Sequence, residues 1–302
     1  MTDLKNTRIL FTDIDGTLLP TTGKDLGPTA DLLADLIRRG YEVVPCTGRG
    51  TGNIPAVIRD VPGVRYLITA NGALVVERDS GRYLYEARVP MDTARAILHF
   101  LRRYPGNTFC YLDGIHYIDN CRPVDAVPEG YDSTVEWLRR VTFVDMEAFC
   151  SEHEGALDKM GFFSFDEALK TQILKDFEEQ PFRPQLLLSK SGAWNIEINM
   201  AHANKGAAAA YVLKMLGYAP EQMIAAGDNL NDLSMLQLAG VSVAPANALA
   251  PVRAAADVVT EDCSRDGVEH FLETLPDLFA QAKPRRRWPQ RRRRRRIERA
   301  SK

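Results

Sequence analysis

Two aspartates, Asp13 and Asp15, stand one residue apart at the end of an apolar run in the stretch ILFTDIDGTLLP (9–20). A carboxylate can attack phosphorus and form an aspartyl-phosphate, provided that cations hold the anionic phosphoryl group beside it. We therefore interpret Asp13 as a nucleophile and Asp15 as the acid that protonates the leaving oxygen and then helps to activate water. Taken alone, the same residues are also typical of a turn, so the rest of such a site must be sought elsewhere in the chain.

Further residues suited to this chemistry lie far downstream. The stretch GDNLND contains Asp228 and Asp232, which with the first pair make an oxygen-rich set of the kind that Mg2+ prefers. The phosphoryl transition state spreads negative charge over its oxygens and needs fixed donors and a positive charge. Thr47 can supply a hydroxyl and backbone N–H groups, and Lys205 can supply a point charge at the start of a helix. The sequence thus predicts Mg2+-dependent chemistry on a phosphate ester.

The elements that must position these residues alternate between strand and helix. We expect strands at 8–13, 41–47, 66–71, 222–228, 241–244 and 257–260, and helices at 28–40, 54–61, 205–217, 233–240 and 266–275. Short apolar runs that alternate with helices predict a parallel sheet with helices on both faces, an α/β fold. Ligands of such sheets gather at the carboxyl ends of the strands. Asp13, Thr47, Asn71 and Asp228 all fall at such ends.

The middle of the chain has a different pattern. Residues 91–104 are helix-like, 109–119 resemble a hairpin, and a strand, a helix and two more strands follow. We interpret 87–198 as a small α+β domain inserted into a core made of 1–86 and 199–282.

Composition places the chain among globular proteins of a reducing compartment. Of its 302 residues, 45% are hydrophobic and 26% are charged, which is ordinary for a globular domain. No apolar run approaches the length of a membrane helix, and the first residues lack the features of a signal peptide. Five scattered cysteines without a CxxC pair argue against a disulfide framework or a zinc site. A cytoplasmic location is therefore expected.

The net charge of −2 conceals a strong asymmetry. Residues 283–302 contain 12 Lys or Arg and one acid, a charge of +11, which leaves −13 on the remainder. Six consecutive arginines repel one another and offer no apolar face, so we expect a disordered basic tail. Such a tail can bind RNA, DNA or an anionic surface without sequence preference, or it can be a solvated extension without a role.

The motifs together resemble a known family. DIDGT, the threonine of CTGR, the lysine of ANKG and the acidic GDNLND follow in the order of the four motifs of haloacid dehalogenase (HAD) superfamily hydrolases. The chain is most similar to the Cof-type branch (subfamily IIB), whose members are mostly phosphatases, and NGA (71–73), IEI (196–198) and DGV (266–268) resemble that branch too. The resemblance covers residues 8 to about 275. It implies a Rossmann-like core with an inserted cap of the C2 type between the second and third motifs.

The resemblance also implies a role for each matching residue. Asp13 is then the nucleophile, and Asp15 is the general acid/base, whose backbone carbonyl binds Mg2+. Asp228 is a metal ligand, and Asp232 completes or supports that shell. The implied substrate-binding and phosphate-binding residues are Thr47, Gly48, Arg49, Asn71, Lys205 and Asn231.

Several functions stay open at this point. The favoured one is a Mg2+-dependent phosphatase for a small phosphorylated metabolite, either a sugar phosphate or a cofactor phosphate such as that of pyridoxal or flavin. An aspartate at position 15, which the dehalogenase and ion-pump members lack, favours phosphomonoester chemistry. A phosphomutase or phosphotransferase would pass the same phosphoryl group to an alcohol. A binding protein on a retired hydrolase fold, or an anion-binding protein that uses the basic tail, belongs to a different class.

Overall fold

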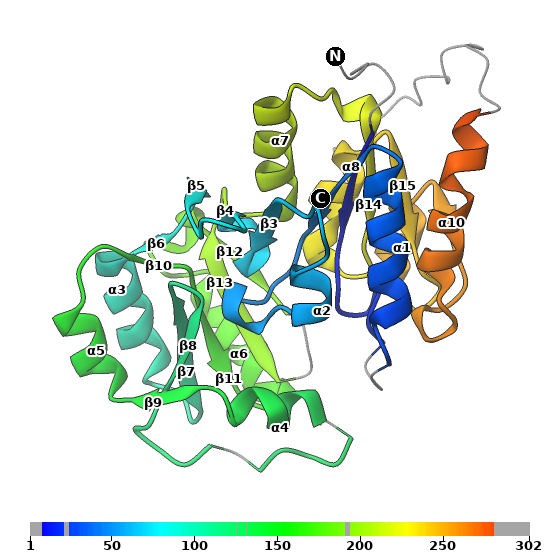
Figure 1. Ribbon diagram of the computed structural model, residues 1–302. Coiled ribbons are helices and arrows are strands. Elements are labelled where there is room, and N and C mark those ends of the chain that lie inside the picture. The colour runs from blue at the N-terminus through cyan, green and yellow to red at the C-terminus, as the bar shows by residue number, and fades with distance from the viewer. Residues whose placement is uncertain (1–7, 21–23, 125, 131, 191–193, 281–302) are drawn as a thin grey trace, which may run out of the picture.

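The computed structural model describes residues 8–20, 24–124, 126–130, 132–190 and 194–280 (Figure 1). The predicted disordered tail at 283–302 lies outside these residues. Figure 1 shows two lobes, one built on a parallel sheet and the other on a separate mixed sheet. The predicted α/β core with an inserted α+β cap is thereby confirmed. Within the described ranges, none of the helices combines the length and the apolar character needed to cross a bilayer.

The core sheet has five parallel strands. Their spatial order is β16 (Val258–Val259), β15 (Val241–Ala244), β14 (Met223–Ala226), β1 (Arg8–Thr12) and β2 (Tyr41–Pro45). Central β1 pairs with β14 and β2, so that Phe11 lies between Ala225 and Val44. Because all five strands run in one direction, the loops that follow β1, β2 and β14 meet at one edge of the sheet.

Helices cover both faces of this sheet, which explains why its strands are apolar throughout. Leu10 points to the face covered by α1 (Gly27–Arg38), α2 (Ala56–Arg59) and α10 (Gly267–Ala280). Its neighbours Ile9 and Phe11 point to the other face, which α7 (Lys205–Leu216), α8 (Leu233–Leu238) and α9 (Ala250–Ala255) cover. The side chains of these three residues are fully buried.

Helix α7 begins and ends where the sequence predicts. The side chain of Asn204 accepts a hydrogen bond of 2.9 Å from the backbone N–H of Ala207, which caps the first turn. Gly217 ends the helix with a φ of 76°, in the left-handed region that glycine adopts without strain. The cap fixes the position of Lys205, the first residue of the helix.

The expected strand at 66–71 is shorter than predicted. Strand β3 (Tyr66–Thr69) ends because Ala70, Asn71 and Gly72 all have a positive φ, of 50°, 62° and 93°, which a strand cannot continue. The strand joins the core sheet through an isolated parallel bridge between Ile68 and Cys46, the residue after β2. It pairs antiparallel with β4 (Leu74–Glu77), which pairs with β5 (Tyr83–Glu86). Gly72 is required here, because a Cβ would lie 2.3 Å from the backbone carbonyl of Asn204. The turn is therefore packed against the start of α7.

The cap is built on a six-stranded mixed sheet. Its order is β12 (Leu186–Ser189), β13 (Asn195–Met200), β11 (Lys159–Phe163), β7 (Asn107–Leu112), β8 (Ile115–Asp119) and β9 (Thr142–Val144). Strands β6 (Val89–Pro90) and β10 (Ala156–Leu157) form a separate antiparallel pair. Strands β7 and β8 form the hairpin predicted at 109–119. The limits of the core (1–86 and 199–282) and of the cap (87–198) stay predictions.

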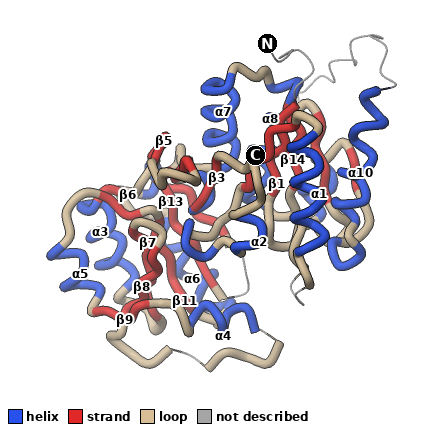
Figure 2. The backbone as a smooth tube through the Cα atoms, in the orientation of Figure 1, coloured by secondary structure: helices blue, strands red, loops and turns tan. Residues whose placement is uncertain are grey.

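Helices cover only one face of the cap sheet completely. Cys110, Met160 and Ile198 share an apolar cluster with α3 (Met91–Leu101), α5 (Met146–Glu152) and α6 (Glu167–Phe177). Figure 2 shows α3 and α5 on the side of the sheet away from the core. Helix α4 (Asp132–Leu138) contributes Trp137 to an aromatic cluster on the opposite face. The remainder of that face is directed toward the core.

Candidate active site

A buried lysine joins the loops that follow β1 and β14. The Nζ atom of Lys205 donates hydrogen bonds of 2.6 Å to Asp13 Oδ1 and 2.6 Å to Asp232 Oδ1, and the lysine is fully buried. Parallel pairing of β1 with β14 brings these loops together, and the backbone N–H of Asp13 donates to the carbonyl of Ala226 at 2.9 Å. Burial alone would lower the pKa of Lys205, but attraction to Asp13 and Asp232 raises it above its ordinary value. The lysine is therefore a permanent positive charge beside Asp13.

Three carboxylates meet at this point and could hold a divalent cation. Asp13, Asp228 and Asp232 each offer an oxygen, and these oxygens lie within 4.8 Å of one another. Burial raises the pKa of Asp13, and repulsion from Asp232 and Asp228 adds to this effect against the opposing attraction of Lys205. Burial and then repulsion from Asp232 raise the pKa of Asp228 to about 6. A single lysine does not balance three carboxylates, so the cluster has an excess of negative charge. Its oxygen donors fit a hard divalent cation such as Mg2+.

The two acidic positions of GDNLND differ in their surroundings. Asp232 Oδ2 accepts hydrogen bonds of 3.0 Å from the backbone N–H groups of both Asp228 and Asn229, so its carboxylate holds the loop in shape. Asp228 Oδ1 accepts a bond of 2.9 Å from the hydroxyl of Thr17, a contact that the sequence analysis did not predict. Gly16 faces the same carboxylate, and a Cβ there would lie 2.4 Å from Asp228 Oδ2. The loop after β1 is therefore shaped to approach Asp228 closely.

Asp15 lies apart from this buried cluster. Its carboxylate is paired with Arg49, which donates from Nε at 2.8 Å and from Nη2 at 2.6 Å. Arg49 Nη1 also donates to the backbone carbonyl of Asn53 at 2.9 Å, which anchors the guanidinium to the loop after β2. The side chains of Asp15 and Arg49 are 49% and 31% exposed, so both lie at the entrance of the site. The structure thus separates a buried carboxylate suited to attack from an accessible carboxylate suited to proton transfer.

The loops that follow β2 and β3 contact each other directly. Thr47 is fully buried, and its backbone carbonyl accepts a hydrogen bond of 3.1 Å from the N–H of Asn71. Its hydroxyl oxygen accepts a bond of 3.1 Å from the N–H of Arg49. A Cβ on Gly48 would lie 2.7 Å from Asn71 Oδ1, so only glycine permits this approach. Asn71 Oδ1 accepts a bond of 3.0 Å from Asn231 Nδ2, which ties both loops to GDNLND.

Two charged residues of the cap reach these loops, and the sequence analysis assigned a role to neither, although Glu197 belongs to the IEI stretch. Lys159, on β11, donates from Nζ to the carbonyl of Gly48 at 2.8 Å and forms an ion pair with Glu197, on β13. Glu197 Oε2 in turn accepts a bond of 2.8 Å from Asn71 Nδ2. The available signal was a lysine and a glutamate inside the apolar runs DKMGFF and NIEINM, because charges in a buried strand require partners.

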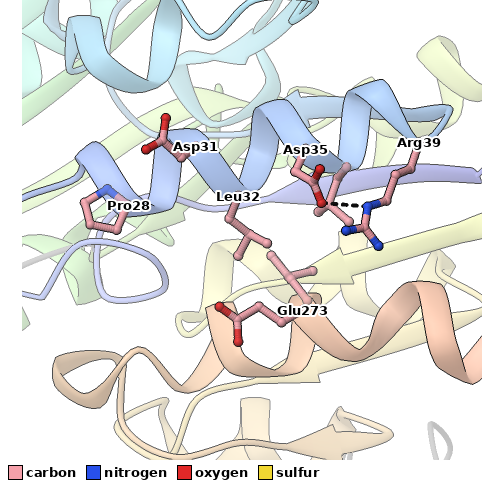
Figure 3. Close-up of a pocket in the computed structure, with 8 residues that line it drawn as sticks. Pro28, Asp31, Leu32, Asp35, Arg39 and Glu273 are labelled. Carbon is pink, nitrogen blue, oxygen red and sulfur yellow. Dashed lines mark ion pairs between the residues drawn. The ribbon is translucent and has the colours of Figure 1, made fainter.

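An open groove of about 350 Å³ lies elsewhere, between α1 and α10 (Figure 3). It contains none of the predicted site residues, and Figure 3 shows Asp35 paired with Arg39, at 2.6 Å. The groove is lined by Pro28, Asp31, Leu32, Asp35, Leu36, Arg39, Leu272 and Glu273. The predicted site residues therefore lie at the strand ends and not in this groove.

Comparisons of the sequence with known proteins identify its family. A family model described as haloacid dehalogenase-like hydrolase matches residues 10–272. The chain is 28% identical, over 261 residues, to the 5-amino-6-(5-phospho-D-ribitylamino)uracil phosphatase YcsE of Bacillus subtilis, and the match covers 86% of this chain and 92% of that protein. It is 26% identical, over 281 residues, to the pyridoxal phosphate phosphatase YbhA of Escherichia coli, with 88% and 97% covered.

Solved structures share the fold over nearly the same extent. A haloacid dehalogenase-like hydrolase from B. subtilis has a TM-score of 0.75 at 26% identity, covering 89% of this chain and 99% of that one. The sugar phosphatase BT4131, of HAD subclass IIB, has a TM-score of 0.72 at 22% identity, with 89% and 99% covered. The chain therefore belongs to the haloacid dehalogenase-like hydrolases, and within them it is a phosphatase of the Cof-type branch, subfamily IIB.

Proposed function

We propose that this phosphatase hydrolyses the monoester of a small phosphorylated metabolite through an aspartyl-phosphate on Asp13, with Mg2+ as its cofactor. The observation that carries the proposal is the position of Asp13, which is buried, bonded to Lys205 and grouped with Asp228 and Asp232. A nucleophilic carboxylate needs positive charge beside it, because an anionic phosphoryl group otherwise repels it, and Lys205 together with a divalent cation would supply that charge.

The proposed reaction has two steps. The Asp13 carboxylate attacks phosphorus while the bond from phosphorus to the ester oxygen breaks, and Asp15 gives its proton to the departing oxygen. Asp15 then takes a proton from a water molecule, which attacks the same phosphorus, and the bond to Asp13 breaks to release inorganic phosphate. Because Asp15 is half-exposed and Asp13 is buried, water can reach the base while the nucleophile stays shielded.

The surrounding residues would hold the phosphoryl oxygens during both steps. Lys205 supplies a fixed positive charge, and the hydroxyl of Thr47 and the backbone N–H of Gly48 lie on the neighbouring loop. Asn231, through its bond to Asn71, keeps the loop after β3 beside the acidic GDNLND loop. When bound, a divalent cation would neutralise the carboxylates of Asp13 and Asp228 and the oxygens of the substrate.

Arg49 would contact the leaving group. Its guanidinium lies at the entrance and can exchange Asp15 for a polar or anionic group of the substrate. This exchange would also free the Asp15 carboxylate for proton transfer. We thus assign Arg49 to substrate binding and Asp13 to the chemical step.

The two relatives are named as phosphatases of 5-amino-6-(5-phospho-D-ribitylamino)uracil and of pyridoxal phosphate, which supports a sugar phosphate or a cofactor phosphate as the substrate class. The test is a panel of phosphorylated metabolites, with and without Mg2+, and with Asp13→Asn as the control. Phosphate release without an added alcohol acceptor is expected. Release that requires an acceptor would identify a phosphotransferase or phosphomutase instead.

All five cysteines are free thiols, which supports the proposed cytoplasmic location.

A further inference from the structure

We infer that Lys159 and Glu197, on the cap sheet, are positioning residues of the phosphate site: they hold the loops of Gly48 and Asn71 in the arrangement that binds a phosphoryl group. This inference rests on the proposed phosphate site at Thr47, Gly48 and Lys205. It assigns to the cap a part in binding the phosphoryl group itself, in addition to any contact with the leaving group.

The pairing of the cap strands places both charges on the face directed toward the core. Gly161 pairs with Glu197 on β13 and with Phe109 on β7, and Lys159 is two residues before Gly161 on the same face. Gly161 leaves the space above it to a neighbour, because a Cβ there would lie 2.1 Å from the ring of Phe109. This face therefore presents Lys159 and Glu197 as diagonal neighbours, with an aromatic wall beside them.

The two charges are almost completely buried and are directed to the catalytic loops. Their side chains are 1% and 4% exposed. The Nζ atom of Lys159 forms the ion pair with Glu197 and donates a hydrogen bond to the carbonyl of Gly48. It also lies 4.5 Å from the centre of the Tyr111 ring, so these three contacts of the ammonium group are polar or aromatic. Burial of an ion pair is costly, and replacement by apolar residues is often neutral for stability. Stability alone therefore does not explain the pair.

These contacts reach the turn after β3, which the loop after β2 also holds through the hydrogen bond from the N–H of Asn71 to the carbonyl of Thr47. Ala70 and Asn71 have left-handed φ angles that cost energy in residues other than glycine. Asn71 Nδ2 donates to Glu197 Oε2 at 2.8 Å and to Asn199 Oδ1 at 3.2 Å, and Asn199 Nδ2 donates to the carbonyl of Ala70 at 3.0 Å. The cap thus holds the side chain and the backbone of the turn at the same time.

A continuous set of contacts leads from the cap to the acidic loop. Lys159 holds the carbonyl of Gly48, and Glu197 orients Asn71. Asn71 then accepts the bond from Asn231, the residue before Asp232. Removal of Lys159 would take this hydrogen-bond donor from the Gly48 carbonyl and the counterion from Glu197. The loop after β2 would then lose its position relative to Lys205.

The test uses three variants of the full chain. Lys159→Met removes the charge while keeping an unbranched side chain, and Lys159→Met/Glu197→Gln removes both charges so that no buried charge is left unpaired. Lys170→Met is the matched control, because Lys170 is also a fully buried cap lysine and pairs with Glu167, outside the proposed site. For each variant we would measure the melting temperature, the inhibition constant of orthovanadate, and kcat and KM with p-nitrophenyl phosphate.

We expect orthovanadate to bind about tenfold more weakly to Lys159→Met and to the double variant, the effect of one lost charge-assisted hydrogen bond. The double variant should melt close to the wild type, and Lys170→Met should bind vanadate normally. The inference is overturned if the folded double variant keeps wild-type vanadate affinity. This includes the case in which only kcat or KM for p-nitrophenyl phosphate changes, since the pair would then act on the leaving group or the reaction and not on the phosphate site. A wild-type protein that binds no vanadate would instead overturn the proposed phosphate site, and this inference with it.

Discussion

Lys205 Nζ lies 2.6 Å from Asp13 Oδ1 and 2.6 Å from Asp232 Oδ1, so a single buried cation joins the proposed nucleophile to the GDNLND loop. The Lys205→Met variant should lose about 10²–10³ in kcat, because a preorganised charge is removed from the phosphoryl group. It should also unfold in urea with a free energy lower by about 3–5 kcal/mol, because the buried carboxylates lose their counterion.

The matched control for this prediction is Lys214→Met, an exposed position on the same helix. That variant should change neither kcat nor the free energy of unfolding by a measurable amount. A Lys205→Met enzyme with kcat within twofold of the wild type would show that the lysine has no part in the reaction.

The separation of Asp15 from the buried cluster predicts a dependence on the leaving group. Asp15→Asn should slow the hydrolysis of alkyl phosphates by about 10²–10⁴, because an alkoxide needs a proton to depart. The first step with p-nitrophenyl phosphate should be affected much less, since nitrophenolate leaves without a proton. Stopped-flow release of nitrophenolate, compared with steady-state phosphate release, checks this prediction. Equal losses for both substrates would contradict it, and Asp92→Asn, on the exposed surface of α3, is the control.

Arg49 should have a different kinetic signature from Asp15. Its guanidinium is anchored by the carbonyl of Asn53 and paired with Asp15, so Arg49→Lys keeps a charge but loses the paired donors. We expect KM for metabolite substrates to rise by about tenfold, with a smaller change in kcat, because the contact is made before the reaction begins. If kcat falls and KM is unchanged, Arg49 acts on the transition state and the assignment to the leaving group is wrong.

The raised pKa of Asp228 predicts how metal binding depends on pH. Its pKa is about 6 in the folded chain and 3.8 ordinarily, so the folded state holds a proton that the unfolded state has lost. The stability from this proton is fully present below about 3.8 and is lost as pH rises through about 6 in metal-free protein. Mg2+ competes with the proton, so it should raise the melting temperature more at about pH 7.5 than at about pH 5. An equal or smaller increase at the higher pH would contradict this account.

Chelation provides the matching experiment at constant pH. Excess chelator should stop catalysis and leave the protein folded, because the core is held by its two apolar faces and not by an ion. Asp228→Asn should abolish the Mg2+-dependent rise in melting temperature, and Ca2+ should support little turnover, because its larger and looser coordination misplaces the phosphoryl oxygens.

The basic segment 283–302 lies outside the described residues, and its predicted role is testable by deletion. The full-length chain should bind a polyanion resin with a log–log salt dependence of about −0.7 to −0.9 per phosphate neutralised, and the deletion variant should not be retained. Phosphatase activity should be unchanged, because all four motifs lie upstream. Loss of catalysis in a folded deletion variant, or salt-insensitive binding of the full chain, would contradict this prediction.

The core and its candidate site could be predicted because each depends on local sequence. A parallel strand buried on both faces is a short apolar run, and the polar residue at its end is adjacent in the sequence, as for Asp13 after β1 and Asp228 after β14. The end of β3 was misplaced, because the left-handed turn at Ala70 and Asn71 is stabilised by residues more than 100 positions away.

The cap contacts could not be predicted for the same reason. Lys159 and Glu197 are 38 residues apart, and they meet because β11 and β13 are neighbours in the mixed sheet. Strand order in such a sheet is set by long-range pairing, and no local pattern records it. The pairing of Arg49 with Asp15 likewise depends on the fold of two separate loops, although both residues were recognised as candidates.

The central claim is that the phosphoryl group is transferred to Asp13, and trapping that intermediate tests it most directly. Asp15→Asn enzyme would be mixed with p-nitrophenyl phosphate and Mg2+, quenched in acid, digested and mapped by mass spectrometry, with Asp13→Asn treated in parallel. The account predicts a phosphorylated peptide that contains residue 13 in the Asp15→Asn sample, modification of Asp13 within it, and neither phosphopeptide nor turnover in Asp13→Asn. Phosphorylation of another residue, or wild-type turnover by Asp13→Asn, would contradict it.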